Sequence, residues 1–203
     1  MPLTKIKSPI KVRGDNSKES LGLVHVITGD GKGKTTSSLG LALRAVGNNL
    51  TVHMIQFLKS GVTGELHSAK KLGFEIEQFG TDALKEKQKK LQEFSDRTGR
   101  FVFNPDIEEK DAAMEGWQHA KDIIKNGKYD MVILDEVNCV LAKNLIPLDE
   151  VLEIVKNHGK IELIFTGRDA PKELMDAADY VNVVTGLKHP WQKGIIARKG
   201  IEY

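Results

Sequence analysis

The stretch from residue 24 to residue 36, VHVITGDGKGKTT, restricts the possible folds of this chain more than any other. An apolar run leads into a segment with glycine at every second position from Gly29 to Gly33, and a helical pattern begins at Lys34. Glycines allow successive N–H groups to turn toward one point. The following helix directs its positive end at the same point. The stretch therefore predicts a strand, a phosphate-binding loop and a helix, as in α/β nucleotide-binding folds.

This loop departs from the usual P-loop pattern in the place of its first glycine. G-x-x-x-x-G-K-[ST] expects glycine five residues before Gly33, and Thr28 stands there instead. An ordinary glycine-rich turn would leave the Lys-Thr-Thr sequence without a role, so we interpret the loop as a P-loop with unusual phosphate geometry. Lys34 can reach phosphate oxygens, and the Thr35 hydroxyl can bind magnesium. The residues expected to contact nucleotide are Thr28, Gly29, Asp30, Gly31, Lys32, Gly33, Lys34, Thr35 and Thr36.

Length and composition limit the class of protein further. The 203 residues suit one α/β domain, and a net charge of +2 gives no sign of a nucleic-acid surface. No apolar run approaches the roughly 18 residues of a membrane span, and no apolar secretory segment opens the chain. A single cysteine, Cys139, excludes an internal disulfide and a cysteine zinc cluster. We expect a cytoplasmic protein without nucleic-acid or membrane partners, with Cys139 as a small apolar filler.

Apolar runs alternate with helical patterns along the chain. The expected strands are 22–28, 50–58, 74–79, 129–134, 161–166 and a final core strand 180–184, and the expected helices are 34–46, 105–125, 147–158 and 171–178. This alternation predicts a mostly parallel sheet covered by helices on both faces, a three-layer P-loop NTPase-like (RecA-like) fold. Residues 21–203 are expected to form one domain, preceded by a flexible arm or lid at 1–20.

We interpret one tryptophan and five histidines of the chain as structural residues. Trp117 belongs to an apolar helical stripe and is expected in the core. Isolated histidines are usually structural, and this interpretation applies to His25, His53, His67, His119 and His158.

The strand at 129–134 ends in two acids, Asp135 and Glu136, about 100 residues after the P-loop. An apolar strand followed by acids resembles a Walker B element, in which a carboxylate beside the phosphates holds magnesium directly or through water. We therefore predict Thr35, Asp135 and Glu136 as ligands of Mg²⁺ or Mn²⁺. Which of the two acids binds the ion directly stays open.

Other polar side chains follow predicted strands, and ligands bind beyond the carboxyl ends of strands in open α/β sheets. Gln56, Lys59 and Glu65 lie at the end of the second strand, close to the P-loop if that strand neighbours the first. Arg168 follows the strand at 161–166 and can contact phosphate or pair with a surface acid.

Several of these stretches together resemble the P-loop type of ATP:corrinoid adenosyltransferase. The resemblance covers residues 21–203, and its motifs are GDGKGKTT at 29–36, QFLK at 56–59 followed by Gly64-Glu65, Trp117, DMVILDE at 130–136, TGR at 166–168, KHP at 188–190 and the segment 197–203. The shifted glycine is similar to that family's own loop.

The resemblance implies that cobalt(I) of a corrinoid attacks the 5′ carbon of ATP, with triphosphate leaving. ATP would lie reversed in the loop. Cobalt is then the nucleophile, and the protein positions the substrates and stabilises the charge that the leaving group gains. The N–H groups from Gly29 to Lys34, and the side chains of Lys34, Thr35, Glu136 and Arg168, would supply this stabilisation.

The family also implies partners and a way to bind the corrinoid. A reduced flavoprotein would donate electrons, the protein would form a homodimer, and its N-terminal segment would cover the site. Phe101 and Phe103 are the candidates for crowding the lower face of the corrinoid.

Two other functions fit a P-loop with Walker B acids. A small metabolite kinase would need an acceptor site and a lid carrying arginines, and it would produce ADP. A nucleotide-dependent switch would order its loops around the γ-phosphate and recruit a protein. The sequence does not identify the preferred corrinoid, the reductase or any nucleotide preference beyond ATP.

Overall fold

The computed structural model describes residues 17–82 and 107–202 of this chain. Phe101, Phe103 and most of the predicted N-terminal arm lie outside the described residues. Within these ranges a single sheet contains six strands, all parallel, in the order β3-β2-β4-β5-β1-β6. The strands are β1 (Val24–Thr28), β2 (Val52–Phe57), β3 (Glu75–Phe79), β4 (Met131–Asp135), β5 (Glu162–Thr166) and β6 (Tyr180–Val183).

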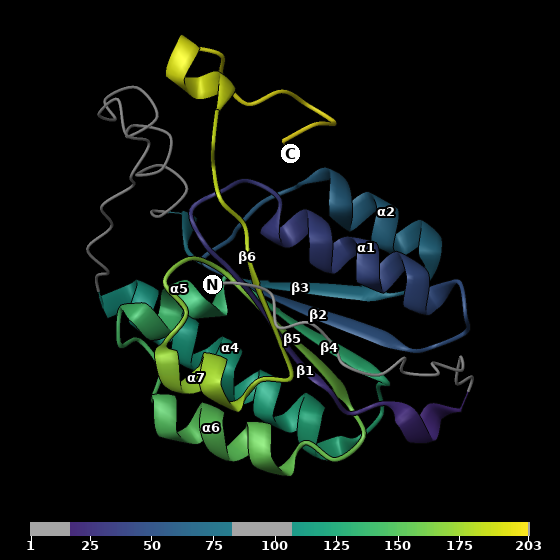
Figure 1. Ribbon diagram of the computed structural model, residues 1–203. Helices are drawn as coiled ribbons and strands as arrows, with labels where there is room; N and C mark the ends of the chain where they lie inside the picture. The colour runs from purple at the N-terminus through teal and green to yellow at the C-terminus, as the bar shows by residue number, and fades with distance from the viewer. Residues whose placement is uncertain (1–16, 83–106, 203) are drawn as a thin grey trace, which may run out of the picture.

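Helices cover both faces of this sheet, which confirms the predicted three layers (Figure 1). One face carries α1 (Lys34–Val46) and α2 (Gly64–Leu72). The opposite face carries α4 (Ile107–Asn126), α5 (Val137–Ala142), α6 (Leu148–Asn157) and α7 (Lys172–Ala177). Short 3₁₀ turns occur at Lys18–Ser20 and Pro190–Lys193. No helix among the described residues is long and apolar enough to span a bilayer.

Two apolar clusters, one on each face of the sheet, hold these layers together. In β4, Val132 and Leu134 pack toward α4, whereas Met131 and Ile133 pack toward α1. Such burial on both faces explains why the central strands read as unbroken apolar runs. Trp117 of α4 is fully buried, as predicted, and its indole N–H donates to Glu150 at 3.0 Å.

The structure differs from the predicted secondary structure at one strand and at two helices. β6 is an edge strand that pairs only with β1 among the described residues, and its side chains are exposed, so the expected core strand is wrong. Two helices, α2 and α5, were not predicted. α5 has only six residues and begins directly after Glu136 without a side-chain cap, so neither length nor capping signals it. α2 carries a single buried residue, Ala69, and so lacks a clear apolar stripe.

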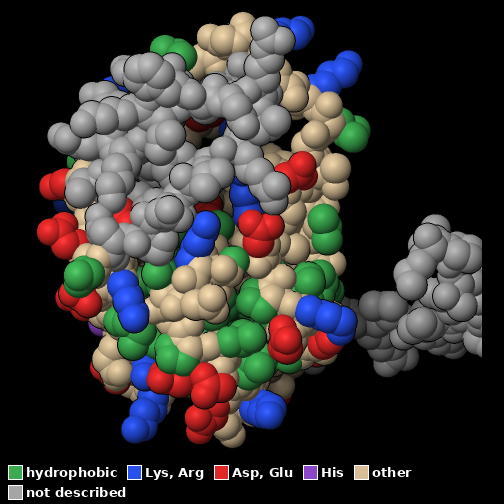
Figure 2. All heavy atoms as spheres, turned by 90° about the vertical axis from the view of Figure 1, so that its left-hand side faces the viewer, with side chains coloured by type: hydrophobic (Ala, Val, Ile, Leu, Met, Phe, Trp, Pro, Cys, Tyr) green, Lys and Arg blue, Asp and Glu red, His purple; other side chains and the backbone are tan. Residues whose placement is uncertain are grey.

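Charges of both signs lie among the described residues on the face of the molecule drawn in Figure 2. Figure 2 shows lysine and arginine interspersed with aspartate and glutamate on one face of the molecule. Within the described residues visible there, no broad area of a single sign appears, in agreement with the net charge of +2.

Candidate active site

The loop between β1 and α1 is shaped by contact with the segment that follows β6. Gly29 has φ +103°, and a Cβ there would lie 2.4 Å from the carbonyl oxygen of Val184. A Cβ on Gly31 would lie 2.7 Å from the carbonyl carbon of Thr185, and the Gly31 N–H donates to Val184 at 2.8 Å. These approaches explain glycine at 29 and at 31. They also mean that one N–H expected to face phosphate is already bonded to Val184.

Lys34, the first residue of α1, lies folded back within the loop. The residue is buried, with an exposed fraction of 7%. The ammonium donates to the carbonyl oxygens of Gly29 and Gly31, each at 2.8 Å. Burial lowers the pKa of Lys34, and the nearby Glu136 carboxylate opposes that shift. The loop thus holds a cation at the position where the sequence predicts phosphate binding.

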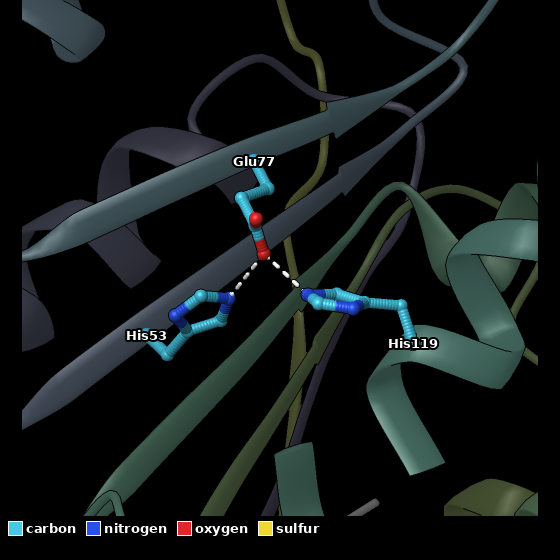
Figure 3. A group of neighbouring side chains, drawn as sticks. All are labelled: His53, Glu77 and His119. Atoms are coloured by element: carbon cyan, nitrogen blue, oxygen red, sulfur yellow. Dashed lines mark hydrogen bonds and ion pairs between the residues drawn. The ribbon is translucent and has the colours of Figure 1, made fainter. Parts of the chain in front are cut away.

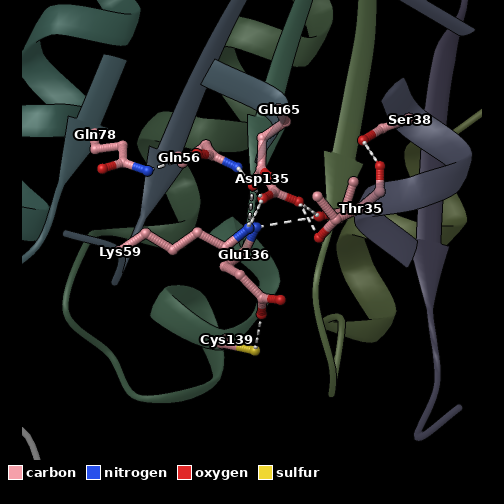
Figure 4. Close-up of polar contacts among 10 residues, drawn as sticks. Thr35, Ser38, Gln56, Lys59, Glu65, Gln78, Asp135, Glu136 and Cys139 are labelled. Atoms are coloured by element: carbon pink, nitrogen blue, oxygen red, sulfur yellow. Dashed lines mark hydrogen bonds and ion pairs between the residues drawn. The ribbon is translucent and has the colours of Figure 1, made fainter. Parts of the chain in front are cut away.

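Asp135, at the end of β4, is the centre of a buried polar network (Figure 4). Its Oδ1 atom accepts hydrogen bonds from the hydroxyls of Thr35 (2.8 Å) and Thr166 (2.6 Å). Its Oδ2 atom accepts from the Gln56 amide (3.1 Å) and the Lys59 ammonium (2.7 Å). A buried carboxylate needs such compensation, and four donors supply it here, from α1, from β5 and from the end of β2 with the loop that follows.

Gln56 and Lys59 lie in the site, as predicted, but the strand that brings them there is β4 and not β1. β2 does not neighbour β1, because β4 and β5 lie between them. Instead Gln56 is the register partner of Asp135 in the β2–β4 ladder. Glu65 joins the group, since its carboxylate accepts from the Gln56 amide at 3.3 Å and lies 3.9 Å from the Lys59 ammonium.

Lys59 keeps its charge in this network. Burial acts to lower its pKa, but the carboxylates of Asp135, Glu136 and Glu65 outweigh burial, and the pKa of Lys59 is raised. Thr166 also belongs to the network and was not predicted. The available signal was a polar residue ending an otherwise apolar strand directly before Gly167-Arg168.

Glu136 adopts a left-handed conformation, φ +62°, which is unusual for a residue with a side chain. Its N–H donates to the Thr166 hydroxyl at 3.1 Å, and its carboxylate lies beside the Cys139 thiol at 3.0 Å. Figure 4 shows the two acids pointing in different directions. Asp135 therefore binds the surrounding protein, while Glu136 faces the pocket described below.

Cys139 connects two segments of the site and is not simply an apolar filler. Its thiol donates to Glu136, and the Arg168 N–H donates to its sulfur at 3.2 Å. Burial first, and the Glu136 carboxylate second, raise the pKa of Cys139. The thiol is therefore a hydrogen-bonding group that remains protonated.

A pocket of about 910 Å³ lies over the P-loop, between α1, α2 and the C-terminal segment. It is comparable in size with sites that bind small molecules and cofactors. The predicted site residues that line it are Asp30, Gly31, Lys32, Gly33, Lys34, Thr35 and Thr36 of the P-loop, together with Lys59, Glu65, Glu136 and Arg168. His189 and Glu202 also line the pocket, and neither was predicted as a site residue.

The oxygen donors at this end of the sheet suit a hard cation. The Thr35 hydroxyl lies 2.8 Å from Asp135, and Glu136 lines the same pocket. Hydroxyl and carboxylate oxygens are the ligands that Mg²⁺ prefers, usually together with phosphate oxygens of a substrate.

Comparison with known proteins identifies relatives of this chain along nearly its whole length. The family model for ATP:corrinoid adenosyltransferase BtuR/CobO/CobP matches residues 20–203. The corrinoid adenosyltransferase CobA of Salmonella typhimurium is 32% identical over 201 residues, covering 98% of this chain and 94% of the relative. The corrinoid adenosyltransferase of Escherichia coli K12 is 30% identical over 203 residues with the same two coverages. A corrinoid adenosyltransferase of Sinorhizobium is 32% identical over 187 residues, covering 90% and 80%.

Proposed function

This chain belongs to the ATP:corrinoid adenosyltransferase family, and we propose that the site around Lys34 and Asp135 performs its reaction. The protein transfers the 5′-deoxyadenosyl group of ATP to the cobalt(I) of a corrinoid, and triphosphate leaves. The observation that carries the assignment of this site is the pocket of about 910 Å³ that joins the P-loop to Lys59, Glu136 and Arg168.

The side chains around the pocket match the electrostatic demand of that reaction. Cobalt(I) supplies the electron pair for the new cobalt–carbon bond, and the electrons of the broken carbon–oxygen bond pass to the triphosphate. The protein therefore needs no nucleophile of its own, but it must stabilise a polyanion. Lys34 would contact the phosphates from within the loop, supported by the N-terminus of α1 and by Arg168. Reversed binding of ATP, with the 5′ carbon exposed to the corrinoid, is part of this proposal.

We also propose a bound Mg²⁺ or Mn²⁺ ion, held by Thr35, Asp135 and Glu136. When bound, the ion would neutralise part of the triphosphate charge. Asp135 is already oriented by Thr166, Gln56 and Lys59, so the carboxylate is fixed before any ion binds.

Further aspects of the function rest on the family alone. We propose a reduced flavoprotein as electron donor, a homodimer, a cytoplasmic location, and an arm at 1–20 that covers the active site of the domain at 21–203. Phe101 and Phe103 remain the proposed contacts to the lower face of the corrinoid.

Sedimentation of the purified protein measures the oligomeric state. Deletion of residues 1–16 tests the proposed arm, through the change in KM for each substrate.

An anaerobic assay tests the proposed function directly. The purified protein is mixed with ATP, Mg²⁺ and chemically reduced cobalt(I)alamin, and the visible spectrum is followed while phosphate products are separated. We expect the spectrum of an alkyl-cobalt product and one triphosphate per cobalt alkylated. ADP without alkylation would instead favour a kinase, and slow phosphate release without corrinoid binding would favour a switch.

A further inference from the structure

Three side chains with metal-binding chemistry meet on the sheet face opposite the P-loop helix (Figure 3). His53 comes from β2, Glu77 from β3 and His119 from α4. Glu77 Oε2 lies 2.9 Å from His53 Nε2 and also contacts His119 Nε2. One ligand atom from each residue lies within 4.8 Å of the others.

The strand register explains why these residues meet. In the parallel β2–β3 pair, His53 is the partner of Glu75, and Ile55 is the partner of Glu77. Alternate residues of a strand share a face, so His53 lies on the same face as Ile55, which packs in the core cluster beneath α4. His119 reaches this face from α4. Each histidine viewed alone in the sequence suggests only a structural role, because the sequence does not show which acid lies opposite.

A second set of contacts surrounds the buried member of the cluster. His53 is 1% exposed, and its Nδ1 atom has no well-aligned hydrogen-bond partner. Glu75 Oε2 lies 3.3 Å from that atom and itself accepts a 2.6 Å hydrogen bond from the Tyr129 hydroxyl. Histidines that bind metal commonly donate their second ring N–H to a carboxylate, which fixes the ring and leaves the other nitrogen free for the metal.

We propose that His53, Glu77 and His119 form a binding site for a divalent transition-metal ion of the zinc class. Two imidazole nitrogens and one carboxylate oxygen match the protein ligands of three-ligand zinc sites, with a fourth position left to water. Nitrogen ligands disfavour Mg²⁺, so this site differs in chemistry from the oxygen donors near Thr35.

The two contacts that Glu77 Oε2 makes with His53 and His119 are shorter than a bound ion requires. Metal–ligand bonds of about 2.0–2.2 Å in a tetrahedron place ligand atoms roughly 3.3 Å apart. Glu77 and His119 therefore have to move outward slightly, and their side chains, 45% and 35% exposed, have room to do so. His53 is fixed by its surroundings. Without a metal, the same cluster is a glutamate hydrogen-bonded between two histidines.

Zinc titration distinguishes these two states. The full chain without an affinity tag is stripped with a chelator, and Zn²⁺ is titrated by calorimetry with millimolar Mg²⁺ present and no nucleotide, so that oxygen-ligand sites are occupied. We expect one Zn²⁺ per chain. Substituting Co²⁺ should give the visible absorption of tetrahedral cobalt with nitrogen ligands. No corrinoid or ATP is used, so failure here leaves the proposed function untouched.

Variants locate the site. His119→Ala and Glu77→Ala should each weaken Zn²⁺ binding by more than about 100-fold, and Glu75→Ala by roughly 10- to 100-fold, because it removes only the outer carboxylate. His67→Ala removes an exposed histidine of α2 and should bind as the parent does. Glu77→Gln keeps the shape of an exposed side chain and serves if His119→Ala folds poorly by circular dichroism. Absence of stoichiometric zinc, or unchanged affinity in both ligand variants, would overturn the proposal.

Discussion

The hydroxyl of Thr35 donates a 2.8 Å hydrogen bond to Oδ1 of Asp135, 100 residues later in the chain. The contact joins the first turn of α1 to the end of β4, although β5 separates β4 from β1 in the sheet. Thr166, at the end of the intervening β5, donates to the same oxygen. One buried carboxylate therefore fixes the relative positions of three segments around the P-loop.

Replacing Asp135 by asparagine should damage both stability and activity. An amide offers one oxygen where four donors now converge, so a donor must face the amide N–H groups, and the Lys59 ammonium loses the nearer of its two carboxylate partners. We expect a loss of about 3 kcal/mol in the free energy of unfolding, typical of a broken buried charge network. Urea denaturation of Asp135→Asn measures it. Asp122→Asn, at an exposed position of α4, is the control, and equal stabilities of the two variants would contradict this account.

Lys34→Ala should lower adenosylation by on the order of 10²-fold or more, by analogy with other preorganised charge-stabilising donors. The effect should appear in kcat, because charge builds on the triphosphate as the carbon–oxygen bond breaks. The rate of cobalt(I)alamin alkylation at saturating ATP provides the measurement. Lys156→Ala on the exposed surface of α6 should retain the parent rate. Near-normal turnover of Lys34→Ala would remove this residue from the mechanism.

Gly29→Ala tests whether the segment after β6 shapes the P-loop. The added Cβ would meet the Val184 carbonyl oxygen at 2.4 Å, and φ there is +103°. Backbone has to move, so we expect destabilisation by roughly 2–4 kcal/mol from strain and overpacking together, and weakened ATP binding. Gly127→Ala also has positive φ, +65°, but meets nothing within 4 Å. It should cost only about 1–2 kcal/mol and leave ATP affinity intact, as measured by calorimetry.

Local patterns were sufficient to predict the P-loop, the acids after β4 and the layered fold. Each depends on residues close in sequence: glycines before Lys34, an apolar run before Asp135, and strands alternating with helices. Strand order is a different kind of information. The prediction placed Gln56 near the P-loop if β2 adjoined β1, whereas β2 adjoins β4, and Gln56 reaches the site through Asp135.

Contacts between distant segments account for what the sequence did not indicate. Thr166 becomes a site residue only because β5 lies between β1 and β4. His53 and His119 become a pair only because Glu77 lies between them on β3. Periodicity identifies which face a residue occupies but not its neighbours on adjacent strands, so such groupings need the register.

Cys139 should resist alkylation despite its place beside the proposed active site. Burial, and then the Glu136 carboxylate, raise its pKa, and the thiolate is the reactive form. We expect iodoacetamide at pH 8 to modify the native protein far more slowly than the urea-unfolded protein. Because the chain has one cysteine, the mass of the intact protein reports the reaction without ambiguity. Modification at the same rate in both states would contradict the burial and hydrogen bonding described for this thiol.

Glu162 should make stability depend on pH in the acid range. Its carboxylate accepts hydrogen bonds from the N–H groups of Gly22 and Leu23, both at 3.0 Å, and lies 2.6 Å from His25 Nε2. Burial alone would raise the pKa of Glu162, but these hydrogen bonds outweigh it, and the pKa lies below its ordinary value of 4.5. A lowered pKa in the folded state means that the stabilisation is present above about pH 4.5. It is lost as the pH falls through the folded-state pKa.

Glu162→Gln should therefore lower the free energy of unfolding by about 1–3 kcal/mol at pH 7, the range for hydrogen bonds to a charged group. The difference from the parent should shrink as the pH falls from 5 toward 3, because the parent carboxyl becomes protonated and loses the same interactions. Urea denaturation at several pH values measures both effects. Glu153→Gln, at an exposed position of α6, should follow the parent throughout. A difference between Glu162→Gln and the parent that stays constant over this range would mean that the carboxylate charge contributes nothing, and that the shape of the side chain alone is responsible.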